Sequence, residues 1–195
     1  MKIGVLALQG DFAAHGRMLE KLGVEWKEVK RSEQLNEIDG LIIPGGESST
    51  MLKLLREEGM IEPLKDFARR GRPVYGTCAG AILLAREVSN PKQESLGLVD
   101  ISIERNAYGR QVDSFTEEAE CPSLGKQPLE MVFIRAPIVR SVGPRVKVLA
   151  RCKGDPVLLR EGSTIISTFH PELTSDTRVH KLFVDTVEQS QKSNA

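Results

Sequence analysis

The stretch Pro73-Val74-Tyr75-Gly76-Thr77-Cys78-Ala79-Gly80-Ala81-Ile82-Leu83-Leu84 determines the fold expected for this chain. Residues 73–76 predict a buried strand, and residues 79–86 predict the helix that follows it. Gly76, Cys78 and Gly80 have the spacing of a sharp strand-to-helix turn that presents a nucleophile. The two glycines let the backbone approach itself closely, and the helix N-terminus favours a thiolate. A tight turn that contains an inert cysteine is also compatible with these five residues.

Strands and helices alternate on both sides of this turn through the first half of the chain. Strands are expected at 2–8, 24–29, 40–44 and 73–76, and helices at 11–22, 48–56, 62–70 and 79–86. Asp11, and either Ser48 or Ser49, are the expected N-caps. This alternation predicts a parallel sheet covered on both faces, with ligands beyond the carboxyl ends of its strands.

The second half of the chain carries strands with little helix between them. They are expected at 98–104, 131–135, 145–150, 156–161 and 164–169, before a closing helix at 177–188. We therefore expect an α/β fold, a three-layer sandwich whose central sheet is mostly parallel and has antiparallel additions. One domain is expected over residues 1–195, with a frayed tail at 189–195.

Composition argues against several classes of function. Lys plus Arg and Asp plus Glu both number 27, so there is no basic excess for binding nucleic acid. The longest apolar runs are too short to span a membrane. The first of them, residues 3–8, is also too short for a secretory signal, so we expect a cytoplasmic protein. The three cysteines lack metal-ligand spacing and are too few for a disulfide framework, so Cys121 and Cys152 are expected to be small buried residues.

A nucleophilic cysteine needs a base, and the chain has three histidines. Two of them fall in expected helices, whereas His170 follows the last expected strand, in Phe169-His170-Pro171-Glu172. Pro171 favours an extended backbone at His170. Residues two apart in an extended segment point the same way, so Glu172 can bind one imidazole nitrogen while the other faces Cys78. A surface histidine beside a turn proline would be preferred if His170 stood alone.

A pair of glycines follows another strand, in Pro44-Gly45-Gly46-Glu47-Ser48-Ser49-Thr50. The N–H groups of Gly45 and Gly46 can turn toward an anionic oxygen, and the N–H of Ala79 would complete an oxyanion hole. A phosphate-binding loop is the competing interpretation. The G-x-x-x-x-G-K-[ST] pattern is absent, however, and Glu47 would repel phosphate.

These three elements, in this order, resemble those of the class I, triad-type glutamine amidotransferases. More specifically, several segments resemble the glutaminase subunits of pyridoxal phosphate synthase: Leu6-Ala7-Leu8-Gln9-Gly10-Asp11, Gly45-Gly46-Glu47-Ser48-Ser49-Thr50, Glu104-Arg105-Asn106-Ala107-Tyr108-Gly109-Arg110-Gln111, Phe133-Ile134-Arg135-Ala136-Pro137 and Phe169-His170-Pro171-Glu172-Leu173-Thr174. The resemblance covers essentially the whole chain and includes every triad position. It implies the flavodoxin-like fold of the class I amidotransferases.

The resemblance also implies roles for the matching residues. Cys78 would be the nucleophile, His170 the base and acid, and Glu172 the group that orients His170. The residues implied to bind L-glutamine are Gly46, Glu47, Ser48, Arg105, Ile134 and Arg135. An Arg can hold the α-carboxylate of free glutamine and a Glu can hold its ammonium, which fits Arg105 and Glu47. Taken singly, each arginine, including Arg110, could equally be a solvated surface charge.

The implied reaction is hydrolysis of L-glutamine to L-glutamate and ammonia through a cysteine thioester, with no metal and no organic cofactor. Neutral water would convert free ammonia to unreactive ammonium, so ammonia should pass directly to a partner. The resemblance names this partner as the barrel-type synthase subunit, in a large hetero-oligomer on which glutaminase activity depends. Gln9, Gly10 and Asp11 are the candidate contacts with it. An ordinary strand-to-helix turn capped by Asp11 is compatible with the same residues.

Three other functions fit parts of the sequence. Another triad amidotransferase, such as the one that serves histidine biosynthesis, would share the triad, but the segment Glu104–Gln111 argues against it. An elbow-cysteine hydrolase or chaperone would leave His170-Pro171-Glu172 unexplained. A scaffold subunit that has lost its chemistry would not need the intact triad.

Overall fold

The computed structural model describes residues 1–106 and 114–193, and its central feature is a seven-stranded sheet in these ranges. The strands are β1 Lys2–Leu6, β2 Glu25–Val29, β3 Gly40–Ile43, β4 Val74–Thr77, β10 Lys147–Cys152, β11 Asp155–Glu161 and β12 Thr164–Ser167. Their order is β10-β11-β12-β4-β3-β1-β2. All pairs from β12 to β2 are parallel, and β11 and β10 extend the sheet as antiparallel pairs. The expected mostly parallel sheet with antiparallel additions is confirmed.

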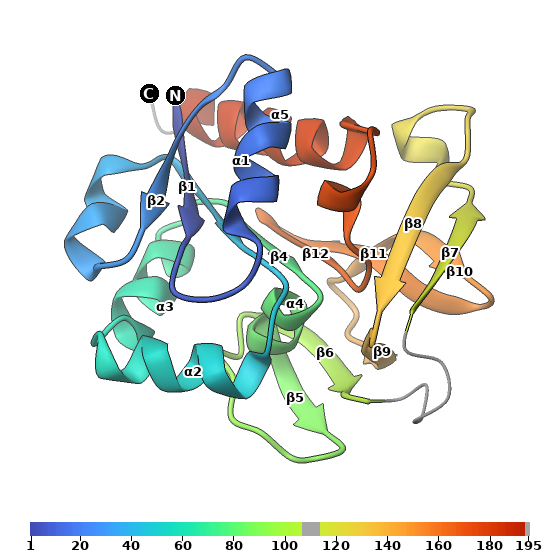
Figure 1. Cartoon of the computed structure of the whole chain (residues 1–195), viewed down its shortest axis with the longest axis horizontal. Helices are drawn as coiled ribbons and strands as arrows, with labels where there is room; N and C mark the ends of the chain where they lie inside the picture. Colours follow the sequence, from blue (N-terminus) through green and yellow to red (C-terminus); the bar gives the residue numbers. More distant parts are fainter. Residues whose placement is uncertain (107–113, 194–195) are drawn as a thin grey trace.

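Helices cover both faces of this sheet and give the expected three layers (Figure 1). The helices are α1 Phe12–Lys21, α2 Ser48–Glu57, α3 Ile61–Arg69, α4 Ala79–Leu84 and α5 Arg178–Ser193, and the short 3-10 turns are η1 Ser32–Glu37, η2 Pro122–Leu124 and η3 Pro171–Leu173. α1 and α5 lie on one face, whereas α2, α3 and α4 lie on the other (Figure 1). The loops that follow β1, β3, β4 and β12 meet at the carboxyl ends of these parallel strands.

Alternation along the strands sends successive side chains into two separate cores. Leu41 and Ile43 of β3 pack in the core that includes α2, α3 and α4, whereas Ile42 packs in the core that includes α1 and α5. β12 divides Ile166 and Ile165 in the same way. Because both faces of the sheet are buried, its strands are continuous apolar runs in the sequence.

The helix after the β4 turn is shorter than the sequence predicts. α4 ends at Leu84, whereas residues 79–86 were expected to be helical. The carbonyl of Leu83 accepts from Leu96 N–H at 2.7 Å, and that of Leu84 accepts from Leu98 N–H at 2.9 Å. These carbonyls therefore accept hydrogen bonds from the segment that contains Leu96 and Leu98, so they are not available to N–H groups that would continue the helix.

Two smaller sheets complete the chain. The first has the order β5-β6-β9, with β5 Ala85–Ser89, β6 Val99–Glu104 and β9 Ile138–Val142, and the second pairs β7 Ser114–Ala119 with β8 Leu129–Ile134. β5, β7 and β9 are not predicted from the sequence. β7 is largely polar and is held by its partner strand, where Phe115 stacks on Phe133 with ring centroids 4.7 Å apart. Pairing of this kind depends on the neighbouring strand rather than on local propensity.

The closing helix extends further than expected. α5 runs to Ser193, so the frayed tail predicted from residue 189 is wrong for residues 189–193, while 194–195 lie outside the described residues. Val187 is fully buried, and the hydroxyl of Ser190 donates to the carbonyl of Gly71 at 3.3 Å, which ties the last turns to the body of the protein. Among the described residues, no helix has the length and apolar character needed to cross a membrane.

Candidate active site

The turn between β4 and α4 holds Cys78 in an uncommon backbone conformation, with φ 47° and ψ −101°. Its N–H donates to the carbonyl of Ser167 on β12 at 2.8 Å. A Cβ on Gly80 would lie 2.2 Å from the carbonyl oxygen of Ile43, and one on Gly76 would lie 2.7 Å from the carbonyl carbon of Gly80. Only glycine fits at these two positions, so the predicted close approach of strand and helix is present. A positive φ at a non-glycine residue is a typical sign of a functional turn.

His170 lies beyond the end of β12, with its ring against Glu172. Nδ1 of His170 is 2.7 Å from Oε1 of Glu172, and the side chain of Glu172 is 1% exposed. The N–H of His170 donates to the carbonyl of Val132 on β8 at 2.8 Å. The expected contact is present, but the expected reason for it is wrong. Pro171–Leu173 form the 3-10 turn η3, and this turn, rather than strand alternation, brings the carboxylate to the ring.

Burial and charge act in opposite directions on these two side chains. Burial lowers the pKa of His170, but hydrogen bonds and negative charge from Cys78 and Glu172 outweigh it and raise this pKa to about 10. Burial raises the pKa of Glu172, but His15 and the hydrogen bond from His170 lower it to about 2. Because Glu172 occupies Nδ1, Nε2 is the ring nitrogen left for Cys78. Near neutral pH the site therefore favours a protonated imidazole between Cys78 and an ionised carboxylate.

A pocket of about 310 Å³ opens beside Cys78, a volume suited to a small ligand. The expected residues that line it are Gly46, Glu47, Ser48, Cys78, Arg105, Ile134, Arg135 and His170. Gln9, which was expected to face a partner, also lines it. The expected residues outside this lining are Gly10, Asp11, Gly45, Ala79 and Glu172. The fold thus brings together all the residues expected to bind substrate.

Glu47 and Arg105 bind each other at the pocket, with Arg105 Nη2 3.0 Å from Oε1 of Glu47. The Glu47 carboxylate also accepts the N–H groups of Ser49 and Thr50 at 3.2 Å and 2.8 Å, so Glu47 is the N-cap of α2. The expectation that Ser48 or Ser49 is this cap is therefore wrong. Burial raises the pKa of Glu47, but the bonds from Ser49 and Thr50 lower it to about 2. The pocket therefore presents a carboxylate and a guanidinium side by side.

The glycine pair after β3 is enclosed by neighbours on both sides. A Cβ on Gly45 would lie 2.4 Å from Cε1 of His170. A Cβ on Gly10 would lie 1.9 Å from the carbonyl oxygen of Gly45, and Oε1 of Gln9 accepts the N–H of Glu47 at 2.9 Å. The position of the glycine pair therefore depends on the loop that follows β1.

Asp11 caps α1, because its Oδ1 accepts the N–H of Ala14 at 3.0 Å. The expectation of a strand-to-helix turn capped by Asp11 is confirmed. Asp11 is also exposed, so a contact between this loop and a partner stays a prediction.

Some residues at the site were not predicted from the sequence. Ile82 and Asn106 line the pocket, and Gln93 accepts a hydrogen bond from the hydroxyl of Ser48 at 3.0 Å. Ile82 lies one helical turn after Cys78, so its place could have been inferred from helical spacing. No local pattern marks Gln93, which reaches the site on the segment that ends α4. Arg110, with the rest of 107–113, lies outside the described residues.

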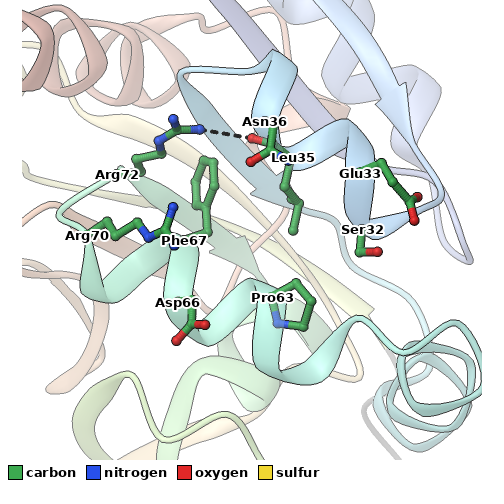
Figure 2. Close-up of a pocket in the computed structure, with 9 residues that line it drawn as sticks. All are labelled: Ser32, Glu33, Leu35, Asn36, Pro63, Asp66, Phe67, Arg70 and Arg72. Carbon is green, nitrogen blue, oxygen red and sulfur yellow. Dashed lines mark hydrogen bonds between the residues drawn. The ribbon is translucent and has the colours of Figure 1, made fainter.

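A second hollow, between η1 and α3, contains none of the expected site residues (Figure 2). Its lining is Ser32, Glu33, Leu35, Asn36, Pro63, Asp66, Phe67, Arg70 and Arg72. Arg72 lies over the ring of Phe67 and donates to the carbonyl of Leu35 at 3.0 Å (Figure 2). This lining includes neither cysteine nor histidine. Within the described ranges, no group of three His, Cys, Asp or Glu side chains is arranged to hold a metal ion.

Comparison with known proteins identifies the family to which this chain belongs. The model of the SNO glutamine amidotransferase family matches residues 5–189. The chain belongs to this family. A pyridoxal 5'-phosphate synthase subunit PdxT from Solibacter usitatus is 56% identical over 188 residues, which cover 94% of this chain and 97% of the relative. Another from Koribacter versatilis is 57% identical over 187 residues, which cover 96% of each chain.

Solved structures agree with membership in the SNO glutamine amidotransferase family. A crystal structure of a glutamine amidotransferase matches with a TM-score of 0.90 at 48% identity, and it covers 95% of this chain and 98% of that chain. The resemblance inferred from the sequence, and the fold that it implied, are therefore confirmed. The near-complete coverage of relatives named as pyridoxal phosphate synthase subunits argues against the alternative of an amidotransferase for histidine biosynthesis.

Proposed function

We propose that this chain hydrolyses L-glutamine to L-glutamate and ammonia at Cys78 and supplies the ammonia for pyridoxal phosphate synthesis. Membership in a glutamine amidotransferase family, and similarity over the whole chain to pyridoxal phosphate synthase subunits, support the substrate and the pathway. The main support for the proposed active site is the 2.7 Å contact between His170 and Glu172, which lies beside the positive-φ turn at Cys78. A nucleophile, a base and an orienting carboxylate in this order form a catalytic triad.

In the first half of the reaction, the thiolate of Cys78 attacks the carboxamide carbon of glutamine and forms a tetrahedral oxyanion. Protonated His170 then gives its Nε2 proton to the amide nitrogen, the carbon–nitrogen bond breaks, and ammonia leaves. The product is a γ-glutamyl thioester on Cys78. Ionised Glu172 stabilises the imidazolium that this step requires at its start.

In the second half, neutral His170 takes a proton from water, and the resulting hydroxide attacks the thioester carbon. The carbon–sulfur bond breaks, the Cys78 thiolate and the His170 imidazolium are restored, and glutamate leaves with a protonated γ-carboxyl group that ionises in water. Both proton transfers that involve His170 thus use the same ring nitrogen, Nε2. The raised pKa of His170 keeps the resting site in the charged form that the first half needs.

Backbone N–H groups of Gly45, Gly46 and Ala79 are the proposed donors to the oxyanion. Ala79 is the first residue of α4, where N–H groups lack partners within the helix. Gly46 lines the pocket beside Cys78 and has a positive φ of 155°. These positions suit donors aimed at the developing negative charge.

Glutamine is held by its two charged ends in this proposal. Its α-carboxylate binds Arg105 and its ammonium binds Glu47, so the substrate inserts between two groups that bind each other at 3.0 Å. Ser48, Ile134 and Arg135 complete the pocket around the carbon chain. Arg135 has a positive φ of 42°, which fixes an unusual bend between β8 and β9 at this wall.

The partner in this proposal is the barrel-type synthase subunit, in a large hetero-oligomer, and it gates the reaction. Docking at Gln9, Gly10 and Asp11 would reach the glycine pair, because Gln9 and Gly10 lie directly against the loop before α2. We also propose a cytoplasmic location and one domain over residues 1–195. Helices from both ends of the chain pack on one sheet, which supports the single domain.

Substitution of Cys78 tests the proposed function. Cys78→Ala and Cys78→Ser are expected to reduce glutamate release to background when the synthase subunit is present. Cys152→Ser is the matched control, because Cys152 is buried on β10 and does not line the pocket. Retained activity in Cys78→Ala would overturn the assignment of the nucleophile. A glutaminase rate that is equally high with and without the synthase would overturn the proposed gating.

A further inference from the structure

A buried polar cluster lies behind the triad and involves the two histidines that the mechanism does not use. His15 on α1 and His180 on α5 are both fully buried, and the two helices cover the same face of the sheet (Figure 1). Nδ1 of His15 is 2.9 Å from Nε2 of His180. Nε2 of His15 is 3.2 Å from Oγ1 of Thr77 and 3.6 Å from Oε2 of Glu172. His15 therefore contacts the residue before the nucleophile and also faces the orienting carboxylate.

The contacts of the cluster indicate where its protons lie. His180 Nδ1 is buried and has no hydrogen-bond partner among the described residues. A buried N–H without a partner is rarer in proteins than an unpaired acceptor, so the His180 proton belongs on Nε2. That N–H then donates to Nδ1 of His15, which places the His15 proton on Nε2. The His15 N–H consequently points toward Thr77 and Glu172.

Both rings are neutral near neutral pH. Burial lowers the pKa of His15, against the opposing effect of Glu172, and it lowers the pKa of His180 to about 3. The other charged groups that act on the pair are His170 and Asp11 for His15, and Lys21 for His180. Because both rings stay neutral over the pH range in which the triad works, the protons remain on Nε2 of His180 and on Nε2 of His15 across that range.

Glu172 needs a partner for its second oxygen. Oε1 accepts from His170 at 2.7 Å, whereas Oε2 is buried and has no partner within hydrogen-bond distance among the described residues. The N–H dipole of His15 at 3.6 Å faces this oxygen. That separation is too long for a hydrogen bond, so the attraction is between a charge and a dipole, and it is strengthened by the low dielectric of the interior.

We propose that His15 is a positioning residue of the glutaminase reaction, because its Nε2–H, directed by His180, holds Glu172 in the orientation that aligns His170 with Cys78. This inference rests on the proposed function, since it needs Glu172 to orient His170. His15 does not line the pocket, so it acts through the carboxylate and not on the substrate.

The first experiment separates a positioning role from a packing role. His15→Leu removes the N–H, and we expect kcat for glutamine to fall about 10- to 100-fold, because small misplacements of catalytic groups have effects of this size. KM should be nearly unchanged. His15→Gln returns an N–H at the reach of Nε2 and should restore most of the lost kcat. His15→Asn is one carbon shorter and should not, so the Gln and Asn pair still decides if His15→Leu fails to fold.

Met18→Ala is the matched control for lost packing. Met18 is buried on the same helix, less than one turn from His15, and it does not line the pocket. We expect it to lower the melting temperature without changing kcat. If the His15 variants lose activity only in proportion to their melting temperature, or keep full kcat, the proposal is overturned.

A double-mutant cycle with Glu172→Gln tests whether His15 acts through the carboxylate. His15→Leu should lower kcat much less in the Glu172→Gln background than in the wild type. Full additivity of the two losses would overturn the proposal. A failure of the proposed function is separate, because it would appear as wild-type protein that releases no glutamate, or as Cys78→Ala that remains active.

Discussion

Arg105 Nη2 lies 3.0 Å from Oε1 of Glu47, so the two groups proposed to bind the charged ends of glutamine bind each other. A zwitterionic amino acid carries a carboxylate and an ammonium on one carbon, and it can satisfy both groups at once. A ligand with only one of these charges would separate the pair and leave one partner unmatched. We therefore expect the site to favour free α-amino acids over simple amides.

Removal of Arg105 should weaken substrate binding more than catalysis. We expect Arg105→Ala to raise KM for glutamine about 10- to 100-fold, since a hydrogen bond to a charged group contributes about 1.5–3 kcal/mol. kcat should change little, because Arg105 is remote from the bond that breaks. Steady-state kinetics with the synthase present measure both values. Arg151→Ala, at an exposed arginine of β10, is the control, and a fall in kcat at constant KM would contradict the assignment.

Loss of the Glu172 charge should impair the chemical step. Glu172→Gln is expected to lower kcat by about 10³- to 10⁴-fold, as for the equivalent change in a serine protease triad. Glu172 also helps to raise the pKa of His170, so the limb of the pH profile that reports His170 should move to lower pH. Glu188→Gln on α5 should leave both quantities unchanged. An active Glu172→Gln enzyme with an unshifted profile would argue that Glu172 is only a structural residue.

The histidine pKa values predict that stability is greatest near pH 6.5. The pKa of His170 is raised from 6.5 to about 10, so its contribution is complete below pH 6.5 and is lost as pH rises toward 10. The pKa of His180 is lowered to about 3, so the unfolded chain binds the extra proton and stability falls below pH 6.5. Glu172, with its pKa lowered to about 2, adds a further loss below pH 4.5.

Urea unfolding across the range from about pH 4 to pH 9 measures this dependence. His180→Leu should reduce the loss of stability on the acid side, to which His15 and Glu172 still contribute, and leave the alkaline side, which depends on His170, in place. Stability that rises continuously from pH 6.5 to pH 9 would contradict the protonated state assigned to His170.

The close packing of the nucleophile turn predicts a steric limit at Gly80. A Cβ there would lie 2.2 Å from the carbonyl oxygen of Ile43, so Gly80→Ala should cost about 2–3 kcal/mol of unfolding free energy. Gly59→Ala is the control, because a Cβ at Gly59 meets nothing within 4 Å and its positive φ of 63° costs only about 1 kcal/mol. Thermal unfolding of both variants measures this difference in stability. Equal melting temperatures would show that α4 can move away from β3.

Much of the site could be predicted from the sequence, because its parts are local. The Gly76-Thr77-Cys78-Ala79-Gly80 turn, the glycine pair and His170-Pro171-Glu172 each carry their chemistry within a few residues. Alternating apolar strands and helices then place such segments at one end of a parallel sheet. The early end of α4 could not be predicted, because Leu96 and Leu98 return from later in the chain to bind its last carbonyls.

Neighbouring residues encode a strand, a sharp turn and a candidate nucleophile, so the α/β fold and the members of the proposed triad could be inferred from the sequence. The pairing of these groups depends on the tertiary structure. Pairing of Arg105 with Glu47, and the approach of His15 and His180 to Glu172, join side chains that are far apart in the chain. Contacts between segments that are distant in the sequence depend on how the sheet and its helices pack. Local propensity for helix or strand does not predict them.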